Sequence, residues 1–384
     1  MILTLLLMQG QALAPTDFTA LLPGDPGEKT INIGGRFMED YSFFSGGEMT
    51  EAALGTTFDD GAEVRRARIR VFGDLSENIA YKMEYDWAGG TASLKDAYLK
   101  FTIDEIGDVF VGHQYEPLGL NTVTSSRYIT FIERSTLSEA FMPERNMGVS
   151  LWNHTDAWTV SGGLFRDADN QGKTTDEGWG ATARAVYRPV FRDQGRSLVH
   201  LGVGASFRQA DGMAQFRARP EAHLLPRFVD TGVLAADQVT LVNLEAAWQE
   251  GPFHAMLEYT MADLTDDAGG VEPSFSGFSI QGGWFLTGEN RGYSTGKGIW
   301  GRVKPRTLAL HDGDEGCGAW EVALRYSNLD LTEAVAVADE LDSITAALNW
   351  YLNNNTRIML DVTQADLDSL DSTTIVALRF AFDF

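Results

Sequence analysis

The stretch VALRFAFDF, residues 376–384, decides the fold class, because bulky apolar side chains stand at every second position in it. Phe380, Phe382 and Phe384 would share one face of an extended strand, with Arg379 and Asp383 on the opposite face. A period of two is typical of a β-strand with one apolar and one polar face. The stretch therefore predicts a strand that separates an apolar phase from water.

The same alternation recurs along the rest of the sequence. It is clearest in residues 79–87, where Tyr81, Met83 and Tyr85 share one face while Lys82 and Glu84 share the other. A soluble sheet can alternate in the same way, but strands of soluble sandwiches are usually only about 5–6 residues long. The segments below therefore favour an all-β, 16-stranded antiparallel transmembrane β-barrel. They are residues 30–38, 63–73, 77–88, 94–103, 108–115, 146–153, 157–165, 178–189, 197–209, 240–249, 252–261, 275–286, 319–329, 341–352, 356–366 and 372–384.

The connections between these segments alternate in length. Outer-membrane barrels join neighbouring strands by short periplasmic turns and longer extracellular loops. Residues 116–145 form a long connection, and because such loops usually have a structure or function of their own, we expect an inward-folded constriction loop there. Residues 287–318 are long although they fall on the short-turn side, so we expect them to fold across or into the pore mouth. Further long connections are expected near 39–62, 166–177, 210–239, 262–274, 330–340 and 367–371.

Composition agrees with a barrel and excludes several other classes. The 384 residues have a formal net charge of −24, which argues against nucleic-acid binding. The mean hydropathy is −0.16, and no apolar run reaches the roughly 18 residues that a spanning helix needs. A chain of this kind can cross a membrane only by closing its backbone hydrogen bonds in a barrel.

The first residues resemble the latter part of an export signal. Residues 2–8 are an apolar run and residues 12–14 read Ala-Leu-Ala, a small-residue processing site, but no basic residue occurs before Lys29. We expect residues 1–14 to be a truncated export signal and residues 15–384 to be the barrel. The single cysteine, Cys317, permits no internal disulfide.

Motifs of catalysis are absent from the sequence. The six histidines have no paired metal-ligand spacing, and no nucleophile elbow, phosphate-binding loop or dinucleotide fingerprint occurs. We therefore expect no enzyme activity, no cofactor and no metal. A barrel enzyme, such as a lipase or protease, and a plugged barrel serving as an adhesin are the alternatives, and a conductance measurement would separate both from an open pore.

Basic residues mark the predicted lumen. In the segment 63–73, alternation places Arg66, Arg68 and Arg70 on the lumen face, about 6.6 Å apart along the strand. Three successive cations repel one another unless anions or carboxylates compensate them, and arginines that line a pore favour anions. The alternative is that these arginines pair with lumen acids and only brace the wall.

Polar and charged residues gather in the long connections. The segment 116–145 carries hydrogen-bond donors that could bind an anion beside the arginines: Thr122, Thr124, Ser125, Ser126, Arg127, Tyr128 and Arg134. Several of the other long connections are rich in Asp and Glu, near residues 39–60, 263–267, 312–315 and 330–340, and these acids most simply form a solvated surface. They could also bind lipopolysaccharide through divalent cations, and unchanged barrel retention in the presence of chelators would contradict that hypothesis.

Several of these stretches together resemble the phosphate-selective porin O and P family. They are VRRARIRVFG (64–73), KDAYLKF (95–101), EPLGLNTVTSSRYITFIERSTLSEAFMPERNMGVSLW (116–152), GWFLTGENRGYS (283–294), GAWEVALRYSNLDL (318–331), LNWYLNNNTRIML (348–360) and ALRF (377–380), and they span nearly the whole expected barrel. The match departs from the family where a lysine is expected before the Thr-Ser-Ser motif, since Thr122 and Val123 stand there, and in extra loop glutamates.

The resemblance implies a bacterial outer-membrane porin, a homotrimer whose third loop narrows the channel and whose basic residues draw small anions, phosphate or related oxyanions, through it. A porin for a broader range of small solutes is the alternative. By motif, the implied pore residues are Arg65, Arg66, Asp96, Ser125, Ser126 and Arg134, beside Arg68, Arg70 and Arg127 from the alternation and the loop composition. The strand ending at Phe384 resembles the signal read by the barrel assembly machinery, an expected partner together with outer-membrane lipid and lipopolysaccharide.

Overall fold

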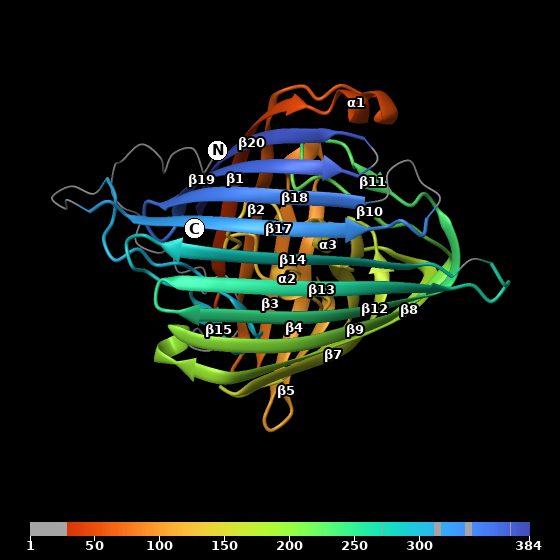
Figure 1. Ribbon diagram of the computed structural model, residues 1–384. Helices are drawn as coiled ribbons and strands as arrows, with labels where there is room; N and C mark the ends of the chain where they lie inside the picture. The colour runs from red at the N-terminus through yellow and green to blue at the C-terminus, as the bar shows by residue number, and fades with distance from the viewer. Residues whose placement is uncertain (1–28, 271, 311–315, 335–339, 369) are drawn as a thin grey trace, which may run out of the picture.

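A computed structural model describes residues 29–270, 272–310, 316–334, 340–368 and 370–384, apart from the side chains of residues 175–177. Sixteen antiparallel strands close into one barrel (Figure 1). In order around the barrel they are β1 (Asn32–Gly46), β2 (Gly61–Ser76), β3 (Ile79–Asp86), β4 (Ser93–Ile103), β5 (Gly107–Tyr115), β6 (Arg145–His154), β7 (Trp158–Ala168), β8 (Thr174–Arg192), β9 (Ser197–Ala214), β12 (Leu234–Glu250), β13 (Phe253–Thr265), β14 (Ser274–Phe285), β17 (Ala319–Asp330), β18 (Glu340–Tyr351), β19 (Thr356–Leu367) and β20 (Ser372–Asp383). The expected export signal, residues 1–14, lies outside the described residues.

Each predicted segment corresponds to one strand of the barrel, but several strands continue further into the long connections. The pairing of β1 with β20 continues to Gly46 opposite Thr373, and that of β9 with β12 continues to Ala214 opposite Leu234. The predicted connections 39–62 and 210–239 were therefore too long. Backbone hydrogen bonds maintain the ladder in these extensions, where the alternation of apolar and polar residues is less regular, so the alternation that revealed the strands stops before the strands do.

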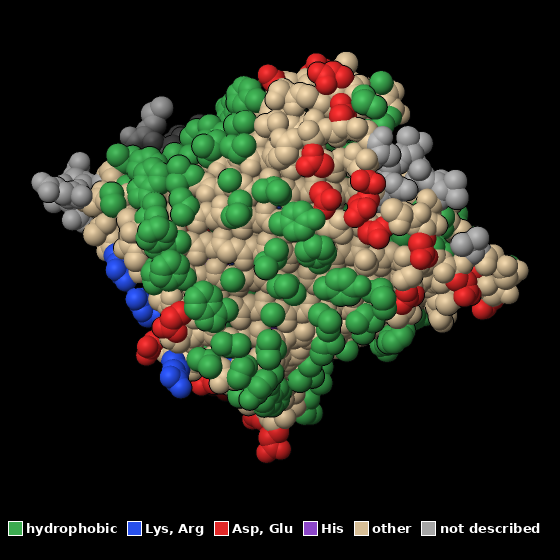
Figure 2. Space-filling model, viewed as in Figure 1, with side chains coloured by type: hydrophobic (Ala, Val, Ile, Leu, Met, Phe, Trp, Pro, Cys, Tyr) green, Lys and Arg blue, Asp and Glu red, His purple; other side chains and the backbone are tan. Residues whose placement is uncertain are grey.

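The outer face of the barrel is apolar where it would meet lipid. Ile280, Leu324 and Ile344 on neighbouring strands are 48%, 58% and 52% exposed. Hydrophobic side chains cover much of the visible wall in Figure 2, whereas acidic side chains gather towards the end of the barrel where the longer loops lie. This distribution matches the alternation of apolar outside and polar inside that membrane barrels require.

Short helical and extended pieces lie in the connections. They are α1 (Glu48–Leu54), η3 (Ala88–Gly90), α2 (Leu120–Val123), α3 (Thr136–Phe141), η4 (Asp193–Gly195) and two hairpins, β10 (Arg217–Ala218) with β11 (Val229–Asp230) and β15 (Tyr293–Ser294) with β16 (Ile299–Trp300). None of the helices in the described part of the chain is long and apolar enough to cross a membrane.

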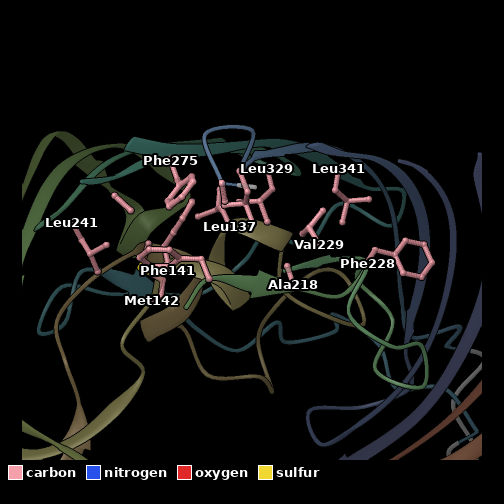
Figure 3. Packing of buried hydrophobic residues seen from close by; sticks show 14 of the residues in the cluster. Leu137, Phe141, Met142, Ala218, Phe228, Val229, Leu241, Phe275, Leu329 and Leu341 are labelled. Carbon is pink, nitrogen blue, oxygen red and sulfur yellow. The ribbon is translucent and has the colours of Figure 1, made fainter. Parts of the chain in front are cut away.

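One large hydrophobic cluster fills part of the barrel interior. Figure 3 shows Phe141 and Met142, from the segment 116–144, together with Phe228 from the connection between β9 and β12. These side chains pack with inward-facing residues of the strands, among them Phe275 and Leu341. The cluster contains residues of β12, β13, β14, β17, β18, β19 and β20, so this side of the lumen is occupied by packed side chains.

Candidate functional site

An irregularity in β2 turns two successive arginines towards the same carboxylate. Along the pairing with β1, Arg66 lies opposite Met38 and Val64 lies opposite Glu39, so Arg65 is the extra residue of a β-bulge. A bulge lets neighbouring side chains share a face, which a regular strand forbids. The Arg65 Nε atom lies 2.9 Å from Glu133 Oε1, and the Arg66 Nη2 atom lies 3.3 Å from Glu133 Oε2. Both arginines thus contact the segment between β5 and β6.

Arg68 and Arg70, the other two arginines predicted on the lumen face of β2, lie in different surroundings. Arg68 forms an ion pair of 2.7 Å with Asp86 and a longer one of 3.5 Å with Glu84. Arg70 forms no ion pair with any described residue; its guanidinium lies 5.0 Å from the centre of the Phe72 ring, and its buried Nε atom has no hydrogen-bond partner there. Carboxylates therefore pair with Arg66 and Arg68, as expected if these arginines brace the wall. Arg70 has no carboxylate partner among the described residues.

The segment 116–144, which connects β5 to β6, is bound to inward-facing side chains of distant strands. The amide of Asn349 on β18 donates a hydrogen bond of 2.8 Å to the Thr130 carbonyl oxygen. On β19, the Arg357 guanidinium donates one of 2.7 Å to Ile129, and the Asp361 carboxylate accepts one of 2.8 Å from the Ile132 backbone N–H. A buried loop needs such partners for its backbone groups. The strand residues that supply them could not be assigned from the loop sequence alone.

The loop residues singled out in the sequence have two kinds of partner. Arg36 on β1 donates hydrogen bonds of 3.3 Å and 2.8 Å to the hydroxyls of Ser125 and Ser126. Arg127 forms an ion pair of 3.2 Å with Asp383 on β20. Arg134 instead donates to backbone carbonyl oxygens of its own loop, 2.9 Å to Asn121 and 2.8 Å to Thr124. Arg134 therefore helps to fix the loop conformation.

Asp96 on β4 is surrounded by cations. Its carboxylate accepts a hydrogen bond of 2.8 Å from Arg145 Nε and forms a second, short contact with the Lys82 ammonium. Lys82 also lies 3.4 Å from Glu84, which is 1% exposed. The two carboxylates thus pair with these cations and hold them in place, which is the structural contribution of Asp96 to this wall.

The charge balance around Glu133 keeps this loop carboxylate ionised. Burial alone would raise the pKa of Glu133, but the charges of Arg65, Arg66 and Arg379 outweigh burial and hold the pKa well below its usual range. The cluster therefore stays charged at physiological pH. Within the described residues, no group of three or more His, Cys, Asp or Glu side chains could hold a metal ion.

Two neighbouring cavities with shared lining side chains lie beside these residues, along the wall formed by β1 to β6. The upper cavity, of about 340 Å³, is lined by the β2 arginines and Glu133. The lower cavity, of about 210 Å³, is lined by Ser125, Ser126 and Arg127. Both are lined by Arg68, Tyr115, Ser126 and Arg145, so they meet at these side chains. The geometry thus brings Arg65, Arg66, Arg68, Asp96, Ser125, Ser126, Arg127 and Arg134 to two neighbouring cavities, whereas Arg70 lines neither.

The connection between β9 and β12, residues 215–233, lies inside the barrel. Its contribution to the site was not predicted from the sequence. Arg325 on β17 lies 3.1 Å from the Glu221 carboxylate, which also accepts hydrogen bonds of 2.6 Å from Ser327 and 2.9 Å from Thr345. Phe216 and Phe228 of the same connection are buried in the hydrophobic cluster. The sequence did carry a signal, since MAQFRARPEAHLLPRFV (213–229) is rich in apolar residues and contains a single acid, unlike the solvated loops.

The segment after β14 also makes contacts inside the barrel. The Arg184 guanidinium on β8 donates hydrogen bonds of 2.8 Å to the carbonyl oxygens of Lys297 and Gly298. The Thr159 hydroxyl on β7 donates one of 2.6 Å to Thr295. These bonds fix the β15–β16 hairpin against the wall and bring Lys297 to the lower cavity. Residues 311–315 of this segment lie outside the described part of the chain.

Comparisons with known proteins agree with this architecture. The family model described as "Phosphate-selective porin O and P" matches residues 31–384. A protein of Caulobacter vibrioides with no described function is 30% identical over 371 residues, covering 91% of this chain and 72% of the relative. Porin O of Pseudomonas aeruginosa is 26% identical over 397 residues, covering 89% of this chain and 84% of the relative. The solved structure of an anion-selective porin from Comamonas acidovorans has a TM-score of 0.59 at 13% identity, covering 93% of this chain and all of that one, and shows a likeness of fold.

Proposed function

Because the chain belongs to the phosphate-selective porin O and P family and is a bacterial outer-membrane porin, we propose that it lets small anions, phosphate and related oxyanions among them, diffuse through the two cavities. Family and fold indicate a channel rather than an enzyme. The path would run beside β1 to β6, since the opposite side of the lumen contains the hydrophobic cluster. Passage of a broader range of small solutes is the alternative.

The lining of the lower cavity carries this proposal. Its side chains include a single carboxylate, that of Asp96, and six basic groups: Arg36, Arg68, Lys82, Arg127, Arg145 and Lys297. Glu84 compensates part of this charge from behind, through ion pairs of 2.9 Å with Arg36 and 3.5 Å with Arg68. Basic side chains at a constriction replace part of the water around an anion and repel cations. The Ser125 and Ser126 hydroxyls add donors that a dehydrated oxyanion can use.

Reversal potentials in planar bilayers with asymmetric KCl test the proposal. We expect the native protein to prefer chloride over potassium, and Arg127→Gln to reduce this preference, because Arg127 lines the lower cavity. Arg217→Gln is the matched control, since Arg217 is exposed and lines neither cavity. A native preference for potassium would refute anion passage.

Phosphate is tested separately by adding it to a chloride solution while the chloride current is recorded. A current that falls with phosphate more than with an equal concentration of acetate would support phosphate binding, whereas equal effects would favour the broader alternative. We also propose that the porin works as a homotrimer, as the family resemblance implies. Native mass spectrometry in detergent would test this proposal, and a monomer alone would contradict it.

A further inference from the structure

The lower cavity shares five lining side chains with a third cavity. The third cavity, here called the exit cavity, has a volume of about 440 Å³ and lies next to the β15–β16 hairpin. The residues that line both cavities, here called the neck, are Lys82, Tyr98, Phe110, Trp152 and Lys297. A solute that passes between the two cavities therefore meets two ammonium groups and three aromatic rings.

The two ammonium groups of the neck differ in what compensates them. Lys82 contacts the carboxylates of Asp96 and Glu84. Lys297 forms no ion pair with any residue that the structure describes; its Nζ atom lies 5.1 Å from the centre of the Phe110 ring and 5.5 Å from that of Trp152. A ring face attracts a cation without neutralising it. The charge of Lys297 therefore remains available to an anion in the neck.

The aromatic wall next to Lys297 offers mostly apolar surface, and its polar groups are the Tyr98 hydroxyl and the Trp152 indole N–H. Phe110 packs edge-on against both of its neighbours, with ring centres 5.2 Å from Tyr98 and 6.5 Å from Trp152. The indole N–H of Trp152 already donates a hydrogen bond of 3.1 Å to the Ser150 hydroxyl. An inorganic anion that loses its water needs donors on all sides, whereas an anion with one apolar end can place that end against the rings.

Lys297 is held at this place by its backbone, while its ammonium forms no ion pair with any described residue. Arg184 binds the carbonyl oxygens of Lys297 and Gly298, and Gly298 adopts the left-handed conformation, with φ of 61°, at the turn of the hairpin. The Lys297 side chain is exposed to the lumen. A carboxylate that draws the ammonium aside would uncover ring surface beneath it.

We propose that the neck is a binding subsite for aromatic monocarboxylates, with the carboxylate paired to Lys297 and the ring packed against Phe110 and Trp152. The inference rests on the proposed function, because the neck lies on the same path for anions. It adds a preference that charge alone does not supply, since charge cannot separate an aromatic carboxylate from acetate. Through its aromatic contacts and the burial of its ring, an aromatic carboxylate should bind about tenfold more tightly than acetate.

Block of the chloride current tests the subsite. The native porin in a planar bilayer is titrated with sodium benzoate and, separately, with sodium acetate, and the half-blocking concentrations are compared. We expect the half-blocking concentration of benzoate to be about tenfold lower than that of acetate. Lys297→Met should weaken block by both anions, whereas Phe110→Leu should weaken block by benzoate and leave that by acetate unchanged. Lys304→Met is the matched control, because Lys304 lies in the same segment but lines neither cavity.

The outcomes separate this inference from the proposed function. Equal block by benzoate and acetate, in a native porin that prefers chloride over potassium, would overturn the subsite and leave anion passage standing. A native preference for potassium would refute anion passage first. Should the variants fail to insert, the comparison of the two anions on the native protein still decides. If cyclohexanecarboxylate blocked as well as benzoate, the restriction of the subsite to aromatic solutes would be overturned.

Discussion

Glu133 is the residue on which the arginines of the upper cavity depend. Glu133→Gln would leave Arg65 and Arg66 without a carboxylate and Arg379 with Asp40 alone. Removing one partner of a buried ion pair typically costs about 3 kcal/mol or more, so we expect the free energy of unfolding in detergent, measured by urea titration, to fall by about that amount. The chloride preference of inserted protein should rise, because a lumen anion is lost.

Glu139→Gln is the control for this prediction. Glu139 lies in the same loop and pairs with Arg219, but its side chain is 33% exposed. Water compensates for much of the loss of such a pair, so the control should change stability little. An unchanged free energy of unfolding in Glu133→Gln would show that the arginines find other partners.

Lys297 gives the anion preference a dependence on pH. Loss of surrounding bulk water inside the barrel and the charges of Lys82 and Lys100 lower the pKa of Lys297 to about 8, against the opposing effects of Asp96 and Asp108. A lysine is charged below its pKa, so its attraction for anions is present at pH 7 and lost as the pH rises above 8. We expect the chloride preference in bilayers to fall between pH 7 and pH 9. Lys297→Met should remove this fall, and a fall of the same size in the variant would assign the titration elsewhere.

The connection 215–233 is bound to the barrel wall through the Glu221 carboxylate, beside its apolar residues in the hydrophobic cluster. Glu221 has a positive φ of 59°, which is costly for a side chain other than glycine. Its contacts with Arg325, Ser327 and Thr345 balance that cost. Glu221→Gln removes the charge that Arg325 binds, so amide hydrogen exchange in residues 215–233 should become faster and single-channel conductance should rise. Glu77→Gln, in an exposed turn, is the control. Unchanged exchange would mean that the hydrophobic cluster alone holds the connection.

The elements of the fold differ in how far the sequence predicts them. Strands such as β3 and β20 were recognisable because lipid on one side and water on the other impose a period of two on their own residues. The inward connection 215–233 was not, because Glu221 depends on Arg325, which is more than a hundred residues away. The bulge at Arg65 was equally hidden, since only its pairing with β1 shows it. Alternation along β2 identified Arg66 and Arg68 as lumen residues. The place of Lys297 in the lower cavity could be seen only in the folded segment after β14.

At the scale of the whole molecule, the acid excess and the basic path oppose each other. The formal net charge of −24 should repel anions from the surface, while six basic side chains line the lower cavity. At 0.15 M salt the Debye length is about 8 Å, so the charge of distant loops is largely screened, whereas lining side chains lie in contact with the solute. The local charge of the path should therefore decide which solutes enter.

Liposome swelling with three solutes of nearly equal size tests this balance. Gluconate is an anion, glucose is neutral and glucosamine is a cation at neutral pH, so a difference between them reports charge rather than size. At 0.15 M salt we expect gluconate to enter fastest and glucosamine slowest, with the differences reduced in Arg127→Gln and retained in Arg217→Gln. At 1 M salt, where the Debye length is about 3 Å, the differences should shrink. If glucosamine entered first at 0.15 M, the outer acids would govern permeation, and the basic lining would serve only to brace the wall.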